Sequence, residues 1–191
     1  QRLLRWTPGP RAGAMRRKAE AIGKAIDNFA GRPSEVALPL CYWNGGRRPA
    51  PETPMDPAKD GCGLIWYSPL VVADPATVRQ YVRFVEQTCI EHGIEPRITL
   101  TSLSARCFDS TVPLLFDTAD PEQVAQAHAC YEALLERGRS LGFMPYRLPT
   151  PWMGRVVNRD HACWRVVEQL KQAIDPRGII APGRYAPRSD P

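Results

Sequence analysis

The stretch Cys62-Gly63-Leu64-Ile65-Trp66-Tyr67-Ser68-Pro69-Leu70-Val71-Val72 contains the strongest strand signal in this chain. Branched and aromatic apolar residues dominate it, as they do in strands that are half or fully buried. Proline cannot donate a hydrogen bond to a sheet ladder, so Pro69 predicts an edge or a break at this point. We therefore expect a strand that starts at Cys62 and is interrupted at Pro69.

Downstream of this strand, the periodicity changes between helical and extended. Four segments show it clearly: 74–92 and 120–141 with helical spacing, 97–104 and 105–116 with strand character. Both helices begin at an Asp-Pro pair, in which aspartate caps the helix and proline suits its first turn. The order strand–helix–strand–strand–helix predicts an α+β fold, a ferredoxin-like antiparallel sheet with helices on one face, followed by a helical C-terminal tail.

The region before Cys62 is less regular. Residues 13–30 predict an amphipathic helix whose apolar stripe consists of Met15, Ile22, Ile26 and Phe29. Residues 36–43 are apolar but interrupted by proline, so they predict an extended or irregular segment. Residues 45–61 form a long loop rich in proline, glycine and charge, and such loops are usually functional or disordered.

The C-terminal segment 145–185 is strongly punctuated. A helix is predicted at about 160–174, and its apolar side chains at helical spacing are Val166, Val167, Leu170 and Ile174. Asp175-Pro176 ends this helix, because proline disfavours a helical residue before it. Gly178 and Gly183 then allow backbone angles that other residues resist. This pattern predicts a C-terminal segment that packs in a defined conformation and is not a loose end.

The composition describes an ordinary globular protein. The chain has 191 residues, 43% hydrophobic and 24% charged, enough for one large core or two small ones. Its net charge of +5 is spread along the sequence, so we expect no nucleic-acid partner, and no apolar run is long enough to cross a bilayer. The first residue is Gln1, and we expect the working protein to extend upstream of it.

The potential metal ligands are scattered. The six cysteines contain no Cys-x-x-Cys pair, so we expect no metal site and interpret them as reduced thiols of a cytoplasmic protein. The three histidines, His92, His128 and His161, are also far apart in the sequence. Neither a glycine-rich phosphate loop nor a Gly-x-Ser-x-Gly motif occurs, so the chain has no nucleotide site of its own.

Four features between residues 61 and 184 resemble the C-terminal part of flavoproteins of the vanillyl-alcohol oxidase and 4-cresol dehydrogenase (p-cresol methylhydroxylase) family. They are Gly63-Leu64-Ile65-Trp66-Tyr67-Ser68-Pro69, Arg106, Tyr146-Arg147 and the Asp-Pro-x-Gly-Ile-x-Ala-Pro-Gly motif at 175–183. The resemblance implies that residues 1–144 are the C-terminal part of the cap, or substrate, domain. Residues 145–191 would then be a return segment that packs on an FAD-binding domain.

The family oxidises para-substituted phenols by moving a hydride from the benzylic carbon to flavin N5, which leaves a quinone methide that water can attack. The resemblance implies that Tyr146 and Arg147 are catalytic and face the phenol oxygen. A phenolate is a much better hydride donor than a phenol, and a permanently cationic arginine favours the phenolate. A tyrosine hydroxyl that donates to the same oxygen adds further stabilisation.

The resemblance also assigns binding residues. The substrate-binding residues are Trp66, Arg106 and Asp109; the cofactor-binding residues are Ala181, Pro182, Gly183 and Arg184. Some family members tether FAD through a histidine where this chain has Leu64, so we expect FAD to be held non-covalently or tethered elsewhere. Members also often have two histidines where this chain has Asp109-Ser110, so the polarity of the pocket is expected to differ.

The FAD-binding domain of the family is not part of this sequence. We therefore expect an FAD-binding domain upstream or in another chain as partner, and a chain that alone neither holds FAD firmly nor turns over substrate. The missing partner predicts an exposed apolar face near Trp152, Met153 and Ile179-Ile180. The substrate would be a small phenol, and the assembly a homo-oligomer or a complex with a cytochrome electron acceptor, with no membrane partner.

Two other readings remain open at this point. The chain could be an α+β module of the same family that binds a partner without redox chemistry. It could also be part of a related FAD-linked 2-hydroxy-acid dehydrogenase, for which a metal-binding histidine cluster would be expected. The sequence does not distinguish oxygen from a cytochrome as the electron acceptor, nor one para substituent from another.

Overall fold

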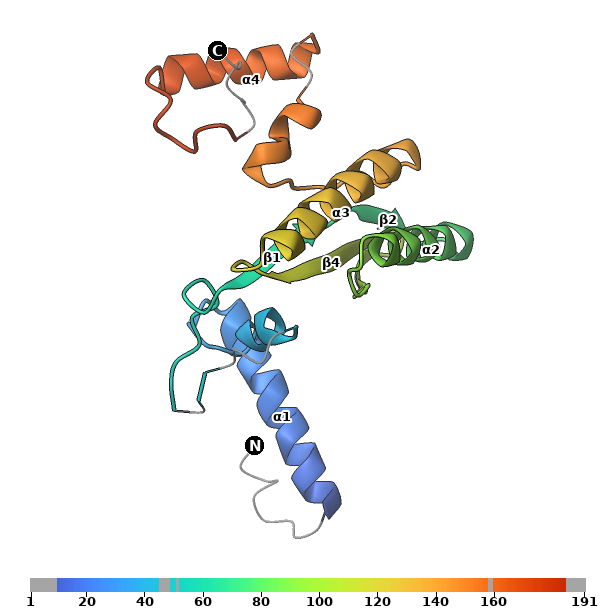
Figure 1. Cartoon of the computed structure of the whole chain (residues 1–191), viewed down its shortest axis with the longest axis vertical. Helices are drawn as coiled ribbons and strands as arrows, with labels where there is room; N and C mark the ends of the chain where they lie inside the picture. The colour runs from blue at the N-terminus through green and yellow to red at the C-terminus, as the bar shows by residue number, and fades with distance from the viewer. Residues whose placement is uncertain (1–9, 45–48, 51, 158–159, 185–191) are drawn as a thin grey trace. The chain divides into compact units, whose positions relative to one another are not determined.

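The computed structural model describes residues 10–44, 49–50, 52–157 and 160–184 (Figure 1). Its elements, in chain order, are α1 (Pro10–Phe29), η2 (Leu38–Tyr42), β1 (Cys62–Tyr67), β2 (Leu70–Val72), α2 (Pro75–Glu91), β3 (Thr99–Ser104), β4 (Cys107–Asp117), α3 (Pro121–Ser140), η3 (Thr150–Arg155) and α4 (Ala162–Ile174). The segment expected to be irregular at 36–43 contains the short η2 helix.

The chain divides into two compact units. The first consists of residues 1–65 and 114–129, and the second of residues 66–113 and 130–191. The division at 144/145 expected from the family resemblance falls inside the second unit and remains a proposal.

The sheet is built around β4. Its order is β1–β4–β2, and β3 also pairs with β4. Both β2 and β3 run antiparallel to β4, and Leu70 and Thr101 lie opposite Asp109 on its two sides. Pro69 separates β1 from β2, as predicted. The predicted α+β architecture with an antiparallel sheet is confirmed.

The helices α2 and α3 cover one face of this sheet. The ring of Tyr67 on β1 makes edge contacts with Phe84 of α2 and Tyr131 of α3, at centroid distances of 6.4 and 6.3 Å. Tyr81 of α2 shares a buried hydrogen bond of 2.6 Å with Ser110 of β4. Burial of these aromatic side chains is a large favourable contribution, and the edge-on geometry adds to it. The prediction of helices on one face is confirmed.

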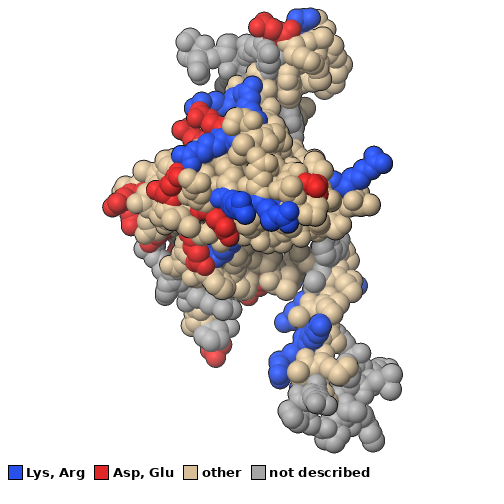
Figure 2. All heavy atoms as spheres, turned by 90° about the vertical axis from the view of Figure 1, so that its right-hand side faces the viewer, with Lys and Arg blue, Asp and Glu red and all other residues tan. Residues whose placement is uncertain are grey.

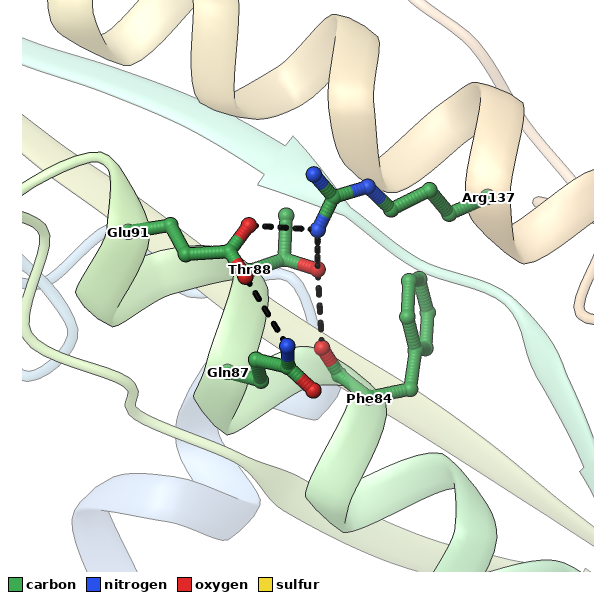
Figure 3. A network of polar contacts seen from close by, with 5 residues as sticks. All are labelled: Phe84, Gln87, Thr88, Glu91 and Arg137. Carbon is green, nitrogen blue, oxygen red and sulfur yellow. Dashed lines mark hydrogen bonds and ion pairs between the residues drawn. The ribbon is translucent and has the colours of Figure 1, made fainter.

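Arg137 links α3 to α2 at the edge of this packing (Figure 3). Its guanidinium donates to Glu91 at 2.6 Å and to Thr88 at 3.4 Å, and the Thr88 hydroxyl donates to the Phe84 carbonyl at 2.8 Å. The hydrogen bond from Arg137, followed by the one from Gln87, lowers the pKa of Glu91. The pair is half-exposed, so its effect on stability is small.

The predicted helix caps are present. The Asp74 carboxylate accepts hydrogen bonds from the backbone nitrogen and the hydroxyl of Thr77, at 2.8 and 2.9 Å. The backbone bond, the larger cause, and the hydroxyl bond both lower the pKa of Asp74. Asp120 accepts from the backbone nitrogen of Glu122 at 3.0 Å and from the side chain of Gln123 at 2.8 Å. Local sequence alone specified both helix starts.

The first unit is held by polar contacts around β4. The hydroxyl of Tyr42 donates to Asp60 at 2.6 Å, and the amide of Asn44 donates to the Leu115 carbonyl at 2.9 Å. These bonds tie both ends of the long loop predicted at 45–61, whose residues 45–48 and 51 lie outside the described part. Gly63 leaves room for Phe116, whose ring would be 2.3 Å from a Cβ at that position.

The apolar stripes predicted on two helices are exposed. The stripe of α1 is exposed at Met15, Ile22 and Ile26, and the stripe of α4 is exposed at Val166, Leu170 and Ile174. The side chain of Phe29 lies outside the described residues. Helical spacing identifies an apolar stripe, but it carries no information about which surface covers the stripe.

The apolar face expected near Trp152 is wrong in part. Trp152 and Met153 are only 6% and 2% exposed, because Trp152 packs against Tyr131 of α3 at a centroid distance of 4.5 Å. Ile179 and Ile180, in contrast, are each 62% exposed, as expected. The 3-10 helix η3 therefore belongs to the core of its unit, and of the four residues expected on this face, Ile179 and Ile180 are the exposed ones.

Charged side chains of both signs, and potential metal ligands, are distributed over the part of the chain that the structure describes. Figure 2 shows acidic and basic side chains interspersed over the middle of the visible face. No helix among the described residues is long and apolar enough to cross a membrane. In the same residues, no three His, Cys, Asp or Glu side chains are grouped as a metal site would require. All six cysteines are free thiols.

Candidate functional site

The break at Pro69 positions Tyr146. Where β1 ends, the Ser68 carbonyl accepts a hydrogen bond of 3.1 Å from the backbone nitrogen of Tyr146. Pro69 and Pro145 form an isolated antiparallel bridge, and the backbone nitrogen of Leu70 donates to Met144 at 3.4 Å. The segment after α3 therefore runs beside the interruption between β1 and β2, because this interruption leaves backbone groups available.

Asp109 lies on the sheet face opposite the helices. Its neighbour Ser110 points into the core toward Tyr81, and successive side chains of a strand alternate between faces. The Tyr146 hydroxyl donates a hydrogen bond of 3.4 Å to Oδ2 of Asp109. The structure thus brings together two predicted site residues that are 37 positions apart.

Arg147 completes this group. Its guanidinium carbon lies 5.1 Å from the centre of the Tyr146 ring, a cation–π distance. Tyr146 is 42% exposed and Arg147 is also exposed, so both are accessible to a ligand. We call Asp109, Tyr146 and Arg147 the open-face cluster.

Two polar atoms in this region are buried and have no hydrogen-bond partner in the part of the chain that the structure describes. They are Oδ1 of Asp109 and the hydroxyl of Ser68, which is 1% exposed. Most buried polar atoms in proteins have a partner, and exceptions often belong to functional sites. The sequence named Ser68 as part of the stretch that ends at Pro69, but it did not indicate Ser68 as a site residue.

The other two predicted substrate residues differ in placement. Trp66 alternates with the buried Ile65 and Tyr67 along β1, so it lies on the same open face as Asp109, and it is 40% exposed. Arg106 lies in the exposed turn between β3 and β4, where its carbonyl accepts from the backbone nitrogen of Ala73 at 2.9 Å. The structure does not bring Arg106 into the open-face cluster.

Asp175 holds the tail motif in one conformation. Its carboxylate accepts hydrogen bonds from the backbone nitrogens of Ile179 and Ile180, at 2.9 and 2.8 Å, and from the Lys171 ammonium. The Lys171 hydrogen bond, followed by the Ile179 backbone bond, lowers the pKa of Asp175 to about 2. Gly178 supplies the positive φ of 64° that the turn requires. This arrangement explains the Asp-Pro-x-Gly-Ile pattern in physical terms.

The predicted cofactor residues 181–184 follow this turn. Ala181 adopts a left-handed backbone with φ 44°, which is uncommon for a residue other than glycine. Gly183 also has a positive φ, and a Cβ there would lie 3.0 Å from the Thr150 methyl group.

The α+β fold of the chain is shared with parts of two solved structures. The structure of p-cresol methylhydroxylase with substrate bound matches with a TM-score of 0.65 and 24% identity, over 83% of this chain and 28% of that one. The structure of 4-ethylphenol oxidase from Gulosibacter chungangensis with isoeugenol matches with a TM-score of 0.68 and 21% identity, over 95% and 31%.

Sequence comparison identifies two curated relatives of this chain. The chain is homologous to the flavoprotein subunit of 4-cresol dehydrogenase [hydroxylating] from Pseudomonas putida, with 26% identity over 66% of this chain and 24% of that protein. It is 34% identical to 1'-carboxy-chondrochloren decarboxylase from Chondromyces crocatus, over 81% of this chain and 28% of that protein. The family resemblance in the sequence is thereby confirmed. No family model matches, and the chain spans about a quarter of the length of these curated relatives.

Proposed function

We propose that this chain is the substrate-facing part of an FAD-dependent oxidoreductase that oxidises para-substituted phenols by hydride transfer from the benzylic carbon to flavin. The open-face cluster is the observation that carries this proposal. It presents an accessible tyrosine hydroxyl and an accessible arginine on the sheet face opposite the helices. The relationship of the chain to phenol-oxidising flavoproteins is supported by its homologues.

Arg147 is the group that stabilises the phenolate. Its charge is permanent, and a nearby cation favours the ionised form of a phenol. The guanidinium lies over the Tyr146 ring, so Tyr146 is a common neighbour of this positive charge and of a phenolate oxygen bound at its hydroxyl. Electrostatic stabilisation of this kind is commonly the largest catalytic contribution when water is excluded.

The remaining predicted residues bind and orient. Trp66 offers an exposed aromatic surface on the same face, suited to stacking against a phenol ring. Residues Ala181, Pro182, Gly183 and Arg184 would contact the FAD, which supplies the hydride acceptor when it is bound. Arg106 is separate from the cluster, so we propose it at the periphery of the substrate site.

Substitution of Arg147 tests the proposal. In the flavin-loaded enzyme that contains this chain, Arg147→Ala should lower kcat/KM for para-alkylphenols by about 10²–10³ while flavin content stays unchanged. Arg83→Ala, on an exposed position of α2, is the matched control and should leave turnover as it is. Near-normal turnover in Arg147→Ala would end the assignment of Arg147 to the phenolate.

From the exposed apolar tail we predict that firm FAD binding requires an FAD-binding domain in addition to this chain. Ile179 and Ile180 are exposed apolar side chains of the C-terminal tail, and we propose that they pack on an FAD-binding domain. Mixed with FAD and passed through gel filtration, the chain of 191 residues should elute without stoichiometric flavin absorbance. Retention of one flavin per chain would contradict this proposal. Oxygen and a cytochrome are both compatible acceptors for the complete enzyme.

Decarboxylation is a second candidate function, because the relative with 34% identity is named a decarboxylase. A phenol with a carboxylate on its para side chain would then release carbon dioxide. Paired assays of one phenol with and without this carboxylate distinguish the two candidates. Carbon dioxide release from the carboxylated substrate supports decarboxylation, and oxidation of the uncarboxylated phenol alone supports benzylic oxidation.

A further inference from the structure

The direction of one hydrogen bond constrains the proton chemistry of the open-face cluster. A tyrosine hydroxyl has a single proton to donate. In this structure Tyr146 donates that proton to Oδ2 of Asp109. The Tyr146 oxygen therefore offers acceptor lone pairs to a ligand, and a neutral phenol that reaches it must act as the donor.

Asp109 is held in place to accept a proton. It lies in the central strand β4, with Leu70 opposite on one side and Thr101 on the other. Its Oδ1 is buried and has no hydrogen-bond donor among the described residues, so the carboxylate has acceptor capacity that these residues do not use. Its Oδ2 contacts Tyr146 and no second donor among the described residues.

We propose that Asp109 is the proton acceptor for the phenol substrate and that Tyr146 relays the proton; the inference rests on the proposed function. The phenol O–H bond breaks as its proton binds to the Tyr146 oxygen. The original Tyr146 O–H bond breaks as that proton binds to Oδ2 of Asp109. The products are a phenolate, an unchanged tyrosine and a protonated Asp109, so atoms and charge balance.

The relay moves the negative charge from Asp109 to the substrate. Before the transfer, the anion is Asp109; afterwards it is the phenolate oxygen at the Tyr146 hydroxyl, whose ring has the Arg147 guanidinium over it. A cation near the phenolate favours the ionised substrate. The 3.4 Å Tyr146–Asp109 bond is longer than usual for O–H···O, as catalytic hydrogen bonds often are before a ligand tightens them.

A series of para-alkylphenols of graded acidity tests the relay in the flavin-loaded enzyme. Asp109→Asn should slow oxidation of weakly acidic phenols by about 10²–10⁴, the range of general base catalysis. Polyfluorinated phenols, assayed at a pH above their pKa so that they are already ionised, should keep near-wild-type rates. Asp109→Glu should recover part of the lost rate for weakly acidic phenols. A purely structural role would slow both groups equally, and that result would overturn the relay.

Binding of 4-nitrophenol gives a second readout that needs no turnover, because this ligand has no benzylic hydrogen. At a pH where the free ligand is mostly neutral, the wild-type enzyme should show the phenolate absorbance band and Asp109→Asn should not. If Asp109→Asn does not fold, Tyr146→Phe removes the middle link at an exposed side chain and should show the same loss. An unchanged phenolate band in these variants would overturn the relay.

The outcomes separate the two proposals. Failure of the wild-type enzyme to oxidise any phenol would reject the proposed function. Oxidation of phenols with a loss in Arg147→Ala, but with equal slowing of all phenols in Asp109→Asn, would reject the relay alone. Glu86→Gln, at an exposed position of α2, controls for loss of a negative charge and should change neither readout.

Discussion

The hydroxyl of Tyr67 on β1 donates a buried hydrogen bond of 3.0 Å to the backbone carbonyl of Phe143, which follows α3. The approach requires a glycine on α3, because a Cβ at Gly138 would lie 2.1 Å from the Tyr67 hydroxyl. This bond ties the end of α3 to the sheet directly before the segment that contains Tyr146. It therefore fixes the position of the chain three residues before Tyr146 of the open-face cluster.

Tyr67→Phe should weaken the fold measurably. The substitution leaves the Phe143 carbonyl buried without its donor, which costs about 1–3 kcal/mol of unfolding free energy. Urea titration of the variant and the parent chain measures this difference. An unchanged midpoint and slope would show that the Tyr67–Phe143 bond contributes nothing to stability.

Gly138→Ala should destabilise the fold by about 1–3 kcal/mol, because the new methyl group overlaps the Tyr67 hydroxyl. Gly154→Ala is the matched control, since nothing lies within 4 Å of a Cβ there. In a double variant, Tyr67→Phe removes the atom closest to the new methyl group. The double variant should therefore lose less unfolding free energy than the sum of the losses in the two single variants. Strict additivity in urea titrations would contradict the described overlap.

Acid should loosen the tail before it unfolds the core. Because the pKa of Asp175 is depressed to about 2, its contribution to stability is complete above the ordinary aspartate range and is lost as the pH falls through about 2. Hydrogen-exchange protection factors of the Ile179 and Ile180 amides should decline over this window. In Asp175→Asn the protection should be low even at neutral pH, while Glu168→Gln, exposed on α4, should behave as the parent.

Glu91→Gln should change stability little and in a salt-dependent way. Arg137 loses its ionic partner, but the pair is half-exposed, and Thr88 keeps its bond to the Phe84 carbonyl. The lowered pKa of Glu91 means that the pair stabilises the fold at neutral pH and loses this effect as the pH falls below the usual glutamate range. Thermal midpoints should differ slightly at low salt and converge at high salt. A large, salt-independent loss would contradict a surface ion pair.

Local features were predictable because nearby residues decide them. The Asp74 and Asp120 caps and the interruption at Pro69 follow from hydrogen bonds and steric limits within a few residues. Burial was predicted less well: Trp152, expected on an exposed apolar face, is buried, and the spacing of the α4 stripe did not indicate that it is exposed. Burial of an apolar side chain depends on contacts with residues that are distant in the sequence, and helical spacing does not indicate which residues these are.

By itself, the sequence determined the order of helices and strands, the Asp175 turn and the relationship to phenol-oxidising flavoproteins, because all three depend on short stretches of neighbouring residues. Only the tertiary structure decided that Tyr146 meets Asp109 and that Arg106 lies apart from both. The reason is strand register: the pairing of β2 with β4 and the bridge between Pro69 and Pro145 place Tyr146 and Asp109 side by side. Such pairing arises from contacts across the sheet, which no single stretch of sequence specifies.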